Sequence, residues 1–142
     1  MRLALYSCGA IISVLLISAV AVAQQKVIQV IDLTEKGMST EGGEATLYQV
    51  KNSRPTICKI DVIHYGETGR SILEFEFGAK LNAAEAREYH YKVPLAEDPK
   101  AQPKLTNRVT MTSWEGRETL QKEFETYKSF FAASDLEQCL KG

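Results

Sequence analysis

Residues 71–78, Ser-Ile-Leu-Glu-Phe-Glu-Phe-Gly, show the most regular hydrophobic alternation in the chain. Apolar side chains there alternate with carboxylates: Leu73, Phe75 and Phe77 with Glu74 and Glu76. A period of two residues is typical of a strand with one buried and one solvated face. Residues 57–65 alternate in the same way, and the short loop 66–69 separates the two stretches. The sequence therefore predicts a β-hairpin here.

Four other stretches are rich in the β-branched and aromatic residues that favour strands. They are residues 27–33, 46–51, 87–93 and 107–113. Glycine, proline and polar residues mark the loops between the strands, at 34–44, 52–55, 66–69 and 94–104. We therefore expect about six strands.

The segment 82–93 allows two interpretations. Asn82 and Glu85 have the spacing of a helix capping box, which would begin a helical turn. Tyr89 and Tyr91, however, alternate with polar residues at the strand period. The alternation favours a strand, and a helical start at residue 82 stays open as the alternative.

After Gly116 the hydrophobic period lengthens to that of a helix. The repeat is formed by one stripe of large apolar side chains: Leu120, Phe124, Tyr127 and Phe131. Ser134 and Glu137 then have the spacing of a capping box for a second, short helix. We expect a C-terminal helical segment over residues 117–141. In its last part we expect three side chains to face the core: Leu136, Cys139 and Leu140.

Strands followed by helices predict a β-rich α+β class. The predicted architecture is either an antiparallel sheet of about six strands with the C-terminal helix packed on it or a two-sheet sandwich. The run from Val50-Lys51-Asn52 through Tyr89 and Tyr91 resembles immunoglobulin-like sandwich modules of secreted bacterial proteins, with a strand, an Asn turn and a hairpin. That resemblance implies the sandwich.

The first 23 residues differ from the rest in composition. Residues 3–23 carry no charged side chain, and all 18 acidic residues follow them. Arg2 precedes an apolar run that ends in Ala21-Val22-Ala23, which is the pattern of a secretory signal peptide cleaved before Gln24. We expect a signal peptide at 1–23, followed by a single domain over 24–142 and secretion or a periplasmic location.

An uncleaved N-terminal anchor is the alternative. The 21 uncharged residues are long enough, as a helix, to cross about 30 Å of hydrocarbon. The A-x-A ending favours cleavage, after which no membrane span is expected.

Two of the three cysteines, Cys58 and Cys139, follow the predicted cleavage site. A pair in an oxidising compartment predicts a disulfide. Closing a loop of about 80 residues would stabilise the fold by roughly 4 to 5 kcal/mol. A redox or zinc pair would require closer spacing or further ligands, so a structural role is favoured.

The whole chain is nearly neutral, with 17 basic and 18 acidic side chains and a net charge of -1. It has no cluster of Lys and Arg that would neutralise phosphates. We therefore expect no nucleic-acid partner. The glycine pair Gly42-Gly43 is flanked by Glu41 and Glu44, and these carboxylates exclude a phosphate-binding loop.

Few residues could carry chemistry. A polar pocket could be formed by two histidines and three carboxylates: His64, His90, Glu74, Glu76 and Glu88. Paired carboxylates serve glycoside hydrolysis, but alternating glutamates also suit the wet face of a strand. No zinc-binding histidine spacing and no serine nucleophile motif occurs. We expect no catalytic residue, no metal and no cofactor.

Large aromatic side chains with a polar group are the best candidates for an interface: Tyr48, Tyr89, Tyr91 and Trp114. The sequence thus favours a secreted or periplasmic module without enzymatic activity that binds a protein or another envelope component. The alternative is a small extracytoplasmic enzyme or ligand carrier that uses the histidine and glutamate pocket.

Overall fold

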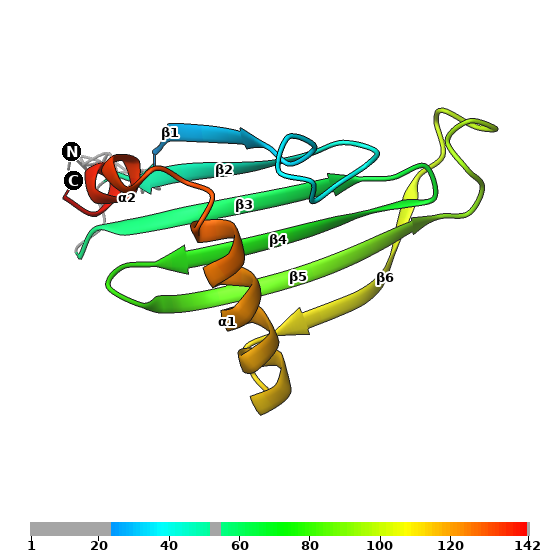
Figure 1. Ribbon diagram of the computed structural model, residues 1–142. Helices are drawn as coiled ribbons and strands as arrows, with labels where there is room; N and C mark the ends of the chain where they lie inside the picture. Colours follow the sequence, from blue (N-terminus) through cyan, green and yellow to red (C-terminus); the bar gives the residue numbers. More distant parts are fainter. Residues whose placement is uncertain (1–23, 52–54, 142) are drawn as a thin grey trace, which may run out of the picture.

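The computed structural model describes residues 24–51 and 55–141. The predicted signal peptide at 1–23 and residues 52–54 of the predicted turn lie outside this part. The described residues form six strands and then two helices (Figure 1). The strands are β1 (Gln25–Asp32), β2 (Gly43–Val50), β3 (Ile57–Tyr65), β4 (Gly69–Phe77), β5 (Leu81–Tyr91) and β6 (Pro103–Thr110). The helices are α1 (Trp114–Lys128) and α2 (Ala133–Lys141).

The six strands form one antiparallel sheet in chain order, from β1 at one edge to β6 at the other. Both helices lie on the same face, with α2 near β1 to β3 and α1 crossing β5 and β6 (Figure 1). The predicted α+β class and the antiparallel sheet with a C-terminal helix are therefore confirmed. The sandwich is not, because hydrogen bonding continues through all six strands and leaves no second sheet within the described residues.

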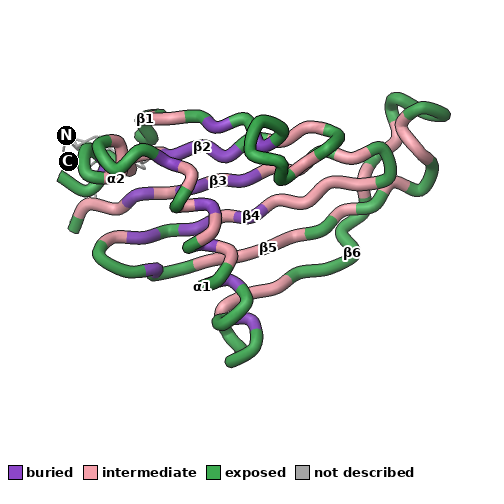
Figure 2. Tube along the Cα trace, viewed as in Figure 1, coloured by how far each residue is buried: buried purple, intermediate pink, exposed green. Residues whose placement is uncertain are grey.

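The core lies between the sheet and the helices (Figure 2). The alternation at 73–77 has the predicted effect: Phe75 and Phe77 are fully buried, while Glu76 is exposed. From α1, Phe124 packs on both rings, with centroids 5.7 Å from Phe75 and 5.1 Å from Phe77. The predicted helical stripe also buries its other three members: Leu120, Tyr127 and Phe131.

Helix α1 begins three residues before the predicted start at 117. Ser113, which the sequence pattern placed in the last strand, is the N-cap: its hydroxyl accepts a 3.0 Å hydrogen bond from the Gly116 amide. Such a cap satisfies a helix N–H group that has no partner within the helix. The predicted strand end at Trp114 to Gly116 was therefore wrong.

The helical alternative at residue 82 was also wrong. Strand β5 runs from Leu81, and Glu85 pairs with Glu74 in the register of β4. Pairing with β4, in which Leu81, Ala83 and Ala84 take part, therefore outweighs the local capping pattern. Strand β6 begins at Pro103, inside the predicted loop 94–104, because a residue without an N–H group is tolerated at the start of an edge strand.

Two expectations for the last helix were wrong. Helix α2 begins at Ala133, so Ser134 lies inside its first turn and does not cap it. Leu140 is 40% exposed, whereas Leu136 packs against the core and Cys139 is fully buried. A helix of nine residues has room for only a narrow buried stripe on this face.

The predicted disulfide is present between Cys58 of β3 and Cys139 of α2, with the Cα atoms 6.0 Å apart. Both half-cystines are fully buried. The Gln49 side chain also donates a 3.0 Å hydrogen bond to the Cys139 carbonyl. The end of the chain is thereby fixed to the middle of the sheet.

Candidate binding surfaces

The sheet separates the predicted pocket residues into two groups. Successive side chains of a strand point to opposite faces, and register places Ser71 beside both His64 and Glu88 on the face that carries the helices. Glu74 and Glu76 follow the opposite parity and lie on the other face. The five candidate residues therefore do not form one pocket.

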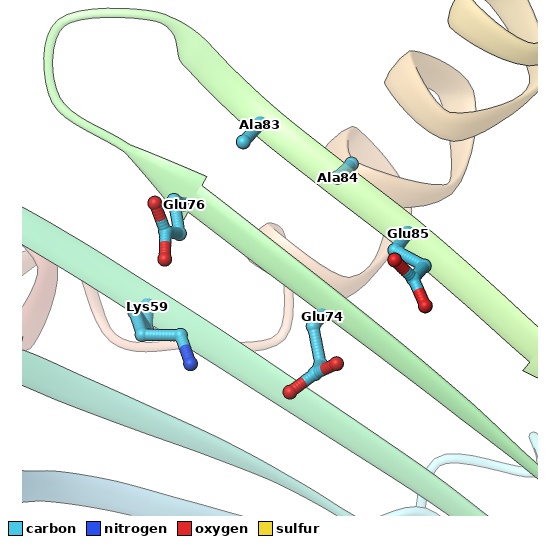
Figure 3. Close-up of a pocket in the computed structure, with 6 residues that line it drawn as sticks. All are labelled: Lys59, Glu74, Glu76, Ala83, Ala84 and Glu85. Atoms are coloured by element: carbon cyan, nitrogen blue, oxygen red, sulfur yellow. The ribbon is translucent and has the colours of Figure 1, made fainter. Parts of the chain in front are cut away.

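A small acidic depression of about 230 Å³ lies on the face opposite the helices (Figure 3). The residues that line it come from three adjacent strands: Lys59, Glu74, Glu76, Ala83, Ala84 and Glu85. Arg87 forms ion pairs with both Glu74 and Glu85. The Arg108 guanidinium donates a 2.7 Å hydrogen bond to Glu85 and lowers the pKa of that carboxyl group.

These contacts favour a structural role for Glu74 and Glu85. Glycoside hydrolysis requires one carboxylic acid with a raised pKa, whereas Arg108 acts in the opposite direction on Glu85. Glu74 and Glu85 are also direct cross-strand partners, and like charges in that position repel each other. Arg87 between them offsets this repulsion.

A row of four cross-strand neighbours lies further along the same face, and we call it the aromatic row. It consists of Tyr65, Arg70, Tyr89 and Leu105, one from each of β3 to β6. Tyr65 is 49% exposed and Leu105 is 45% exposed. The row therefore presents apolar surface on the side of the sheet away from the helices.

Arg70 occupies a central position in the aromatic row. Its guanidinium carbon lies 5.2 Å from the centroid of the Tyr89 ring, which is a cation–π contact. Its Nε atom is buried and has no hydrogen-bond acceptor among the residues that the structure describes. The row thus contains a guanidinium group that is held in place by the Tyr89 ring.

The four predicted interface aromatics do not gather at one place. Tyr89 belongs to the aromatic row, and Tyr91 lies two residues further along the same face of β5. Tyr48 shares this face but pairs with Lys59, about 20 Å along β3 from Tyr65. Trp114, 75% exposed, begins α1.

Tyr65, Arg70 and Leu105 were not predicted from the sequence. The first two are cross-strand partners at the end of the predicted hairpin, so the hairpin register could have indicated them. Leu105 depends on a register shift between Glu88 and Tyr89. No pattern in the sequence signals that irregularity.

On the other face, a cavity of about 340 Å³ lies between α1 and the sheet, and we call it the α1 cleft. Four apolar residues line it: Leu73, Ala86, Val109 and Leu120. Seven polar residues complete the lining: His64, Ser71, Arg87, Glu88, Thr119, Glu123 and Tyr127. The α1 cleft combines an apolar surface with hydroxyl, imidazole and carboxylate groups.

The polar end of the α1 cleft contains a hydrogen-bonded pair. The His64 Nε2 atom lies 2.7 Å from the Tyr127 hydroxyl. Burial lowers the pKa of His64, and the nearby Glu123 carboxylate opposes this shift in part. Burial and Glu123 together raise the pKa of Tyr127 to about 12. Both members of the pair are therefore uncharged at neutral pH.

The remaining pocket candidates lie beside the α1 cleft. A second depression, of about 290 Å³, shares His64, Ser71 and Glu88 with it and includes His90. The Glu88 carboxylate accepts a 3.4 Å hydrogen bond from Asn107, while His64 is bonded to Tyr127. The histidines and Glu88 thus surround a common groove without forming a catalytic relay.

No protein-family model matches the chain, and neither a curated protein nor a solved structure matches it. Within residues 24–51 and 55–141, no group of three or more His, Cys, Asp or Glu residues could hold a metal ion. The helices in this part of the chain are also too short or too polar to cross a membrane. Function is therefore inferred from the geometry of the two surfaces.

Proposed function

We propose that the chain is an exported module without enzymatic activity that binds another protein, or a proteinaceous component of the envelope, through the aromatic row. The observation that carries this proposal is the row itself, in which a positioned arginine lies between exposed aromatic and apolar side chains. Tyrosine and arginine are enriched in the parts of interfaces that contribute most binding energy.

The chemistry of the partner follows from Arg70. The Arg70 guanidinium forms no ion pair with the described residues, and a carboxylate of the partner would supply a charge-assisted hydrogen-bond acceptor for it. Tyr65 and Leu105 on either side would contact apolar side chains. We therefore propose a partner surface with an aspartate or glutamate surrounded by apolar residues.

Export of a single domain over 24–142 belongs to the same proposal. The pattern at 1–23 is that of a cleavable signal peptide. A disulfide between Cys58 and Cys139 suits the oxidising conditions outside the cytoplasm. A secreted or periplasmic location would bring the aromatic row into contact with other extracytoplasmic proteins.

Site-specific photo-crosslinking tests the proposed surface. A photoreactive phenylalanine analogue is placed at Tyr89 or, as a control on the same face, at Tyr48, in cells that normally produce the chain. We expect a discrete adduct from position 89 and none from position 48. The cross-linked peptide should contain Asp or Glu.

A charge reversal completes the test. Arg70→Glu should abolish the adduct at position 89, whereas Arg117→Glu, on an exposed position of α1, should leave it unchanged. An adduct that persists in Arg70→Glu, or equal adducts from positions 48 and 89, would contradict the proposal. Circular dichroism of each variant verifies that the fold is intact.

A second function, the binding of a small ligand, is favoured by one observation: His64 and Glu88 both line the α1 cleft, which also has apolar residues from the sheet and from α1 in its lining. This function corresponds to the ligand-carrier alternative that the sequence leaves open. Only the pocket candidates on the helix-bearing face take part in it. Glu74 and Glu76 take no part in it, because they lie on the opposite face.

A further inference from the structure

We infer that the α1 cleft binds a cationic amphiphile, namely an ammonium group attached to an apolar body. The α1 cleft shares no lining residue with the aromatic row, whose side chains lie on the opposite face of the sheet. Binding there is independent of the protein-binding proposal and extends the ligand-binding function to a chemical class.

The apolar lining and the volume of the α1 cleft indicate that its ligand has an apolar body. Leu73 and Ala86 form the sheet side, and Leu120 forms the helix side. Leu73 and Leu120 are almost completely buried, so only part of each side chain reaches the cleft. A cavity of about 340 Å³ has the volume typical of sites for small molecules. A short hydrocarbon chain in this space would remove apolar surface from water mainly at the partly exposed Ala86 and Val109.

The negative charge of the α1 cleft indicates that its ligand carries an ammonium group. Glu88 from β5 and Glu123 from α1 line the cleft from two sides. Glu123 lies four residues before Tyr127 on α1 and therefore on the same side of the helix, which places it at the polar end. A cation in this position would be attracted by both carboxylates, whereas an anion would be repelled.

The one basic side chain of the lining does not neutralise this charge. Arg87 contributes to the wall of the α1 cleft, but its guanidinium forms ion pairs with Glu74 and Glu85 on the opposite face. A partly buried guanidinium held by two carboxylates has little freedom to reorient. Glu88 and Glu123 therefore remain available to a ligand.

The hydrogen-bonding groups agree with this assignment. An ammonium group has three donors and no acceptor. The α1 cleft offers carboxylate oxygens together with the hydroxyl groups of Ser71 and Thr119. His64 and Tyr127 are already bonded to each other at 2.7 Å. The polar groups that line the cleft are thus mainly acceptors.

Three ligands with the same hydrocarbon chain and different head groups test the inference: octylamine, octanol and octanoate. The purified chain without residues 1–23 and with its disulfide intact is titrated with each ligand below its micelle concentration. Methyl signals of Leu73, Val109 and Leu120 are followed by NMR, and affinities are measured by calorimetry. We expect octylamine to bind at least about tenfold more tightly than octanoate, with an affinity that falls as salt is added.

A pair of variants on the same helix locates the charge. Glu123→Gln should weaken octylamine binding by about fivefold, the loss of one partly exposed charge pair, and leave octanol binding unchanged. Glu125→Gln is the control, because Glu125 is exposed and bonded to Gln121. Equal effects of the two variants would overturn the inference.

Two other outcomes would also overturn it. One is octanoate binding as tightly as octylamine, and the other is an absence of shifts at the methyl groups of these three residues with all three ligands. Neither outcome would affect the photo-crosslinking result, since Tyr89 and Arg70 lie on the other face. The two proposals can therefore fail separately.

Discussion

His64, near the end of β3, and Tyr127, in the last turn of α1, are joined by a hydrogen bond of 2.7 Å that links the sheet to the helix. Their ring centroids are 5.9 Å apart. The imidazole is therefore held in a place where a positive charge is poorly solvated. This contact has consequences for the pH dependence of stability.

The free energy of unfolding should fall as the pH is lowered below about 6.5, because burial lowers the pKa of His64 in the folded chain. In the window between the two pKa values the unfolded chain binds the proton and the folded chain does not, so acid favours unfolding. At a pH above the pKa of His64 in the unfolded chain, the contribution of His64 to the free energy of unfolding is constant. Urea titrations between pH 5 and 7.5 measure the slope.

The variant His64→Gln isolates this effect, because glutamine does not titrate and retains a group that can bond to Tyr127. We expect a smaller slope for His64→Gln than for the parent chain over the same interval. Parallel curves for the two proteins would show that His64 makes no such contribution.

Cys139→Ser should lower the free energy of unfolding by about 4 to 5 kcal/mol, because the bond closes a loop with a sequence separation of 81. Equilibrium unfolding in urea without reductant measures the difference. Addition of a reductant to the parent chain should reproduce most of the loss. An unchanged midpoint in the variant would show that the disulfide does not stabilise the fold.

Gly116→Ala should destabilise the protein, although alanine favours a helix by about 1 kcal/mol over glycine. A Cβ atom at this position would overlap the carbonyl oxygen of Thr110, which belongs to the backbone of β6. Rotation of a side chain cannot relieve such an overlap. Thermal unfolding compares this variant with Gly78→Ala, whose added Cβ would meet its nearest neighbour at 3.8 Å. Greater stability of Gly116→Ala would refute the overlap.

Phe124→Ala should cost about 3 to 5 kcal/mol, because it removes a fully buried ring from contact with Phe75 and Phe77. The exposed neighbour provides the control: Glu125→Ala should change stability by less than about 0.5 kcal/mol. Both values come from urea unfolding at neutral pH. Similar losses in the two variants would mean that α1 does not pack on the sheet through Phe124.

The sequence predicted the structure correctly where a single physical requirement determined the local conformation. The bounds of β3 agree with the expectation of 57–65, because its alternation is uninterrupted and both neighbours are hydrogen-bonded to it. The stripe through Phe124 identified the buried face of α1. The disulfide between Cys58 and Cys139 followed from the count of two cysteines after the predicted cleavage site.

The sequence did not predict the structure where two physical requirements favoured different conformations. Local capping chemistry at Asn82 opposed pairing with β4, and pairing prevailed. The sequence pattern could have shown that Glu74 and His64 lie on opposite faces of the sheet. His64 is in phase with buried Cys58, whereas Glu74 is out of phase with buried Leu73. The aromatic row and the α1 cleft depend on cross-strand register and on the crossing of a helix, which a single sequence does not encode in any short pattern.

The disulfide also determines the effect of a break in the backbone. The connection from Lys92 to Gln102 is largely exposed and lies between the two half-cystines in the chain. A protease that nicks it after Lys100 would produce two fragments, one ending there and one containing β6 and both helices. The fragments would migrate together on a gel until the cystine is reduced, so the nicked molecule would keep its last helix tethered to the strand it rests on.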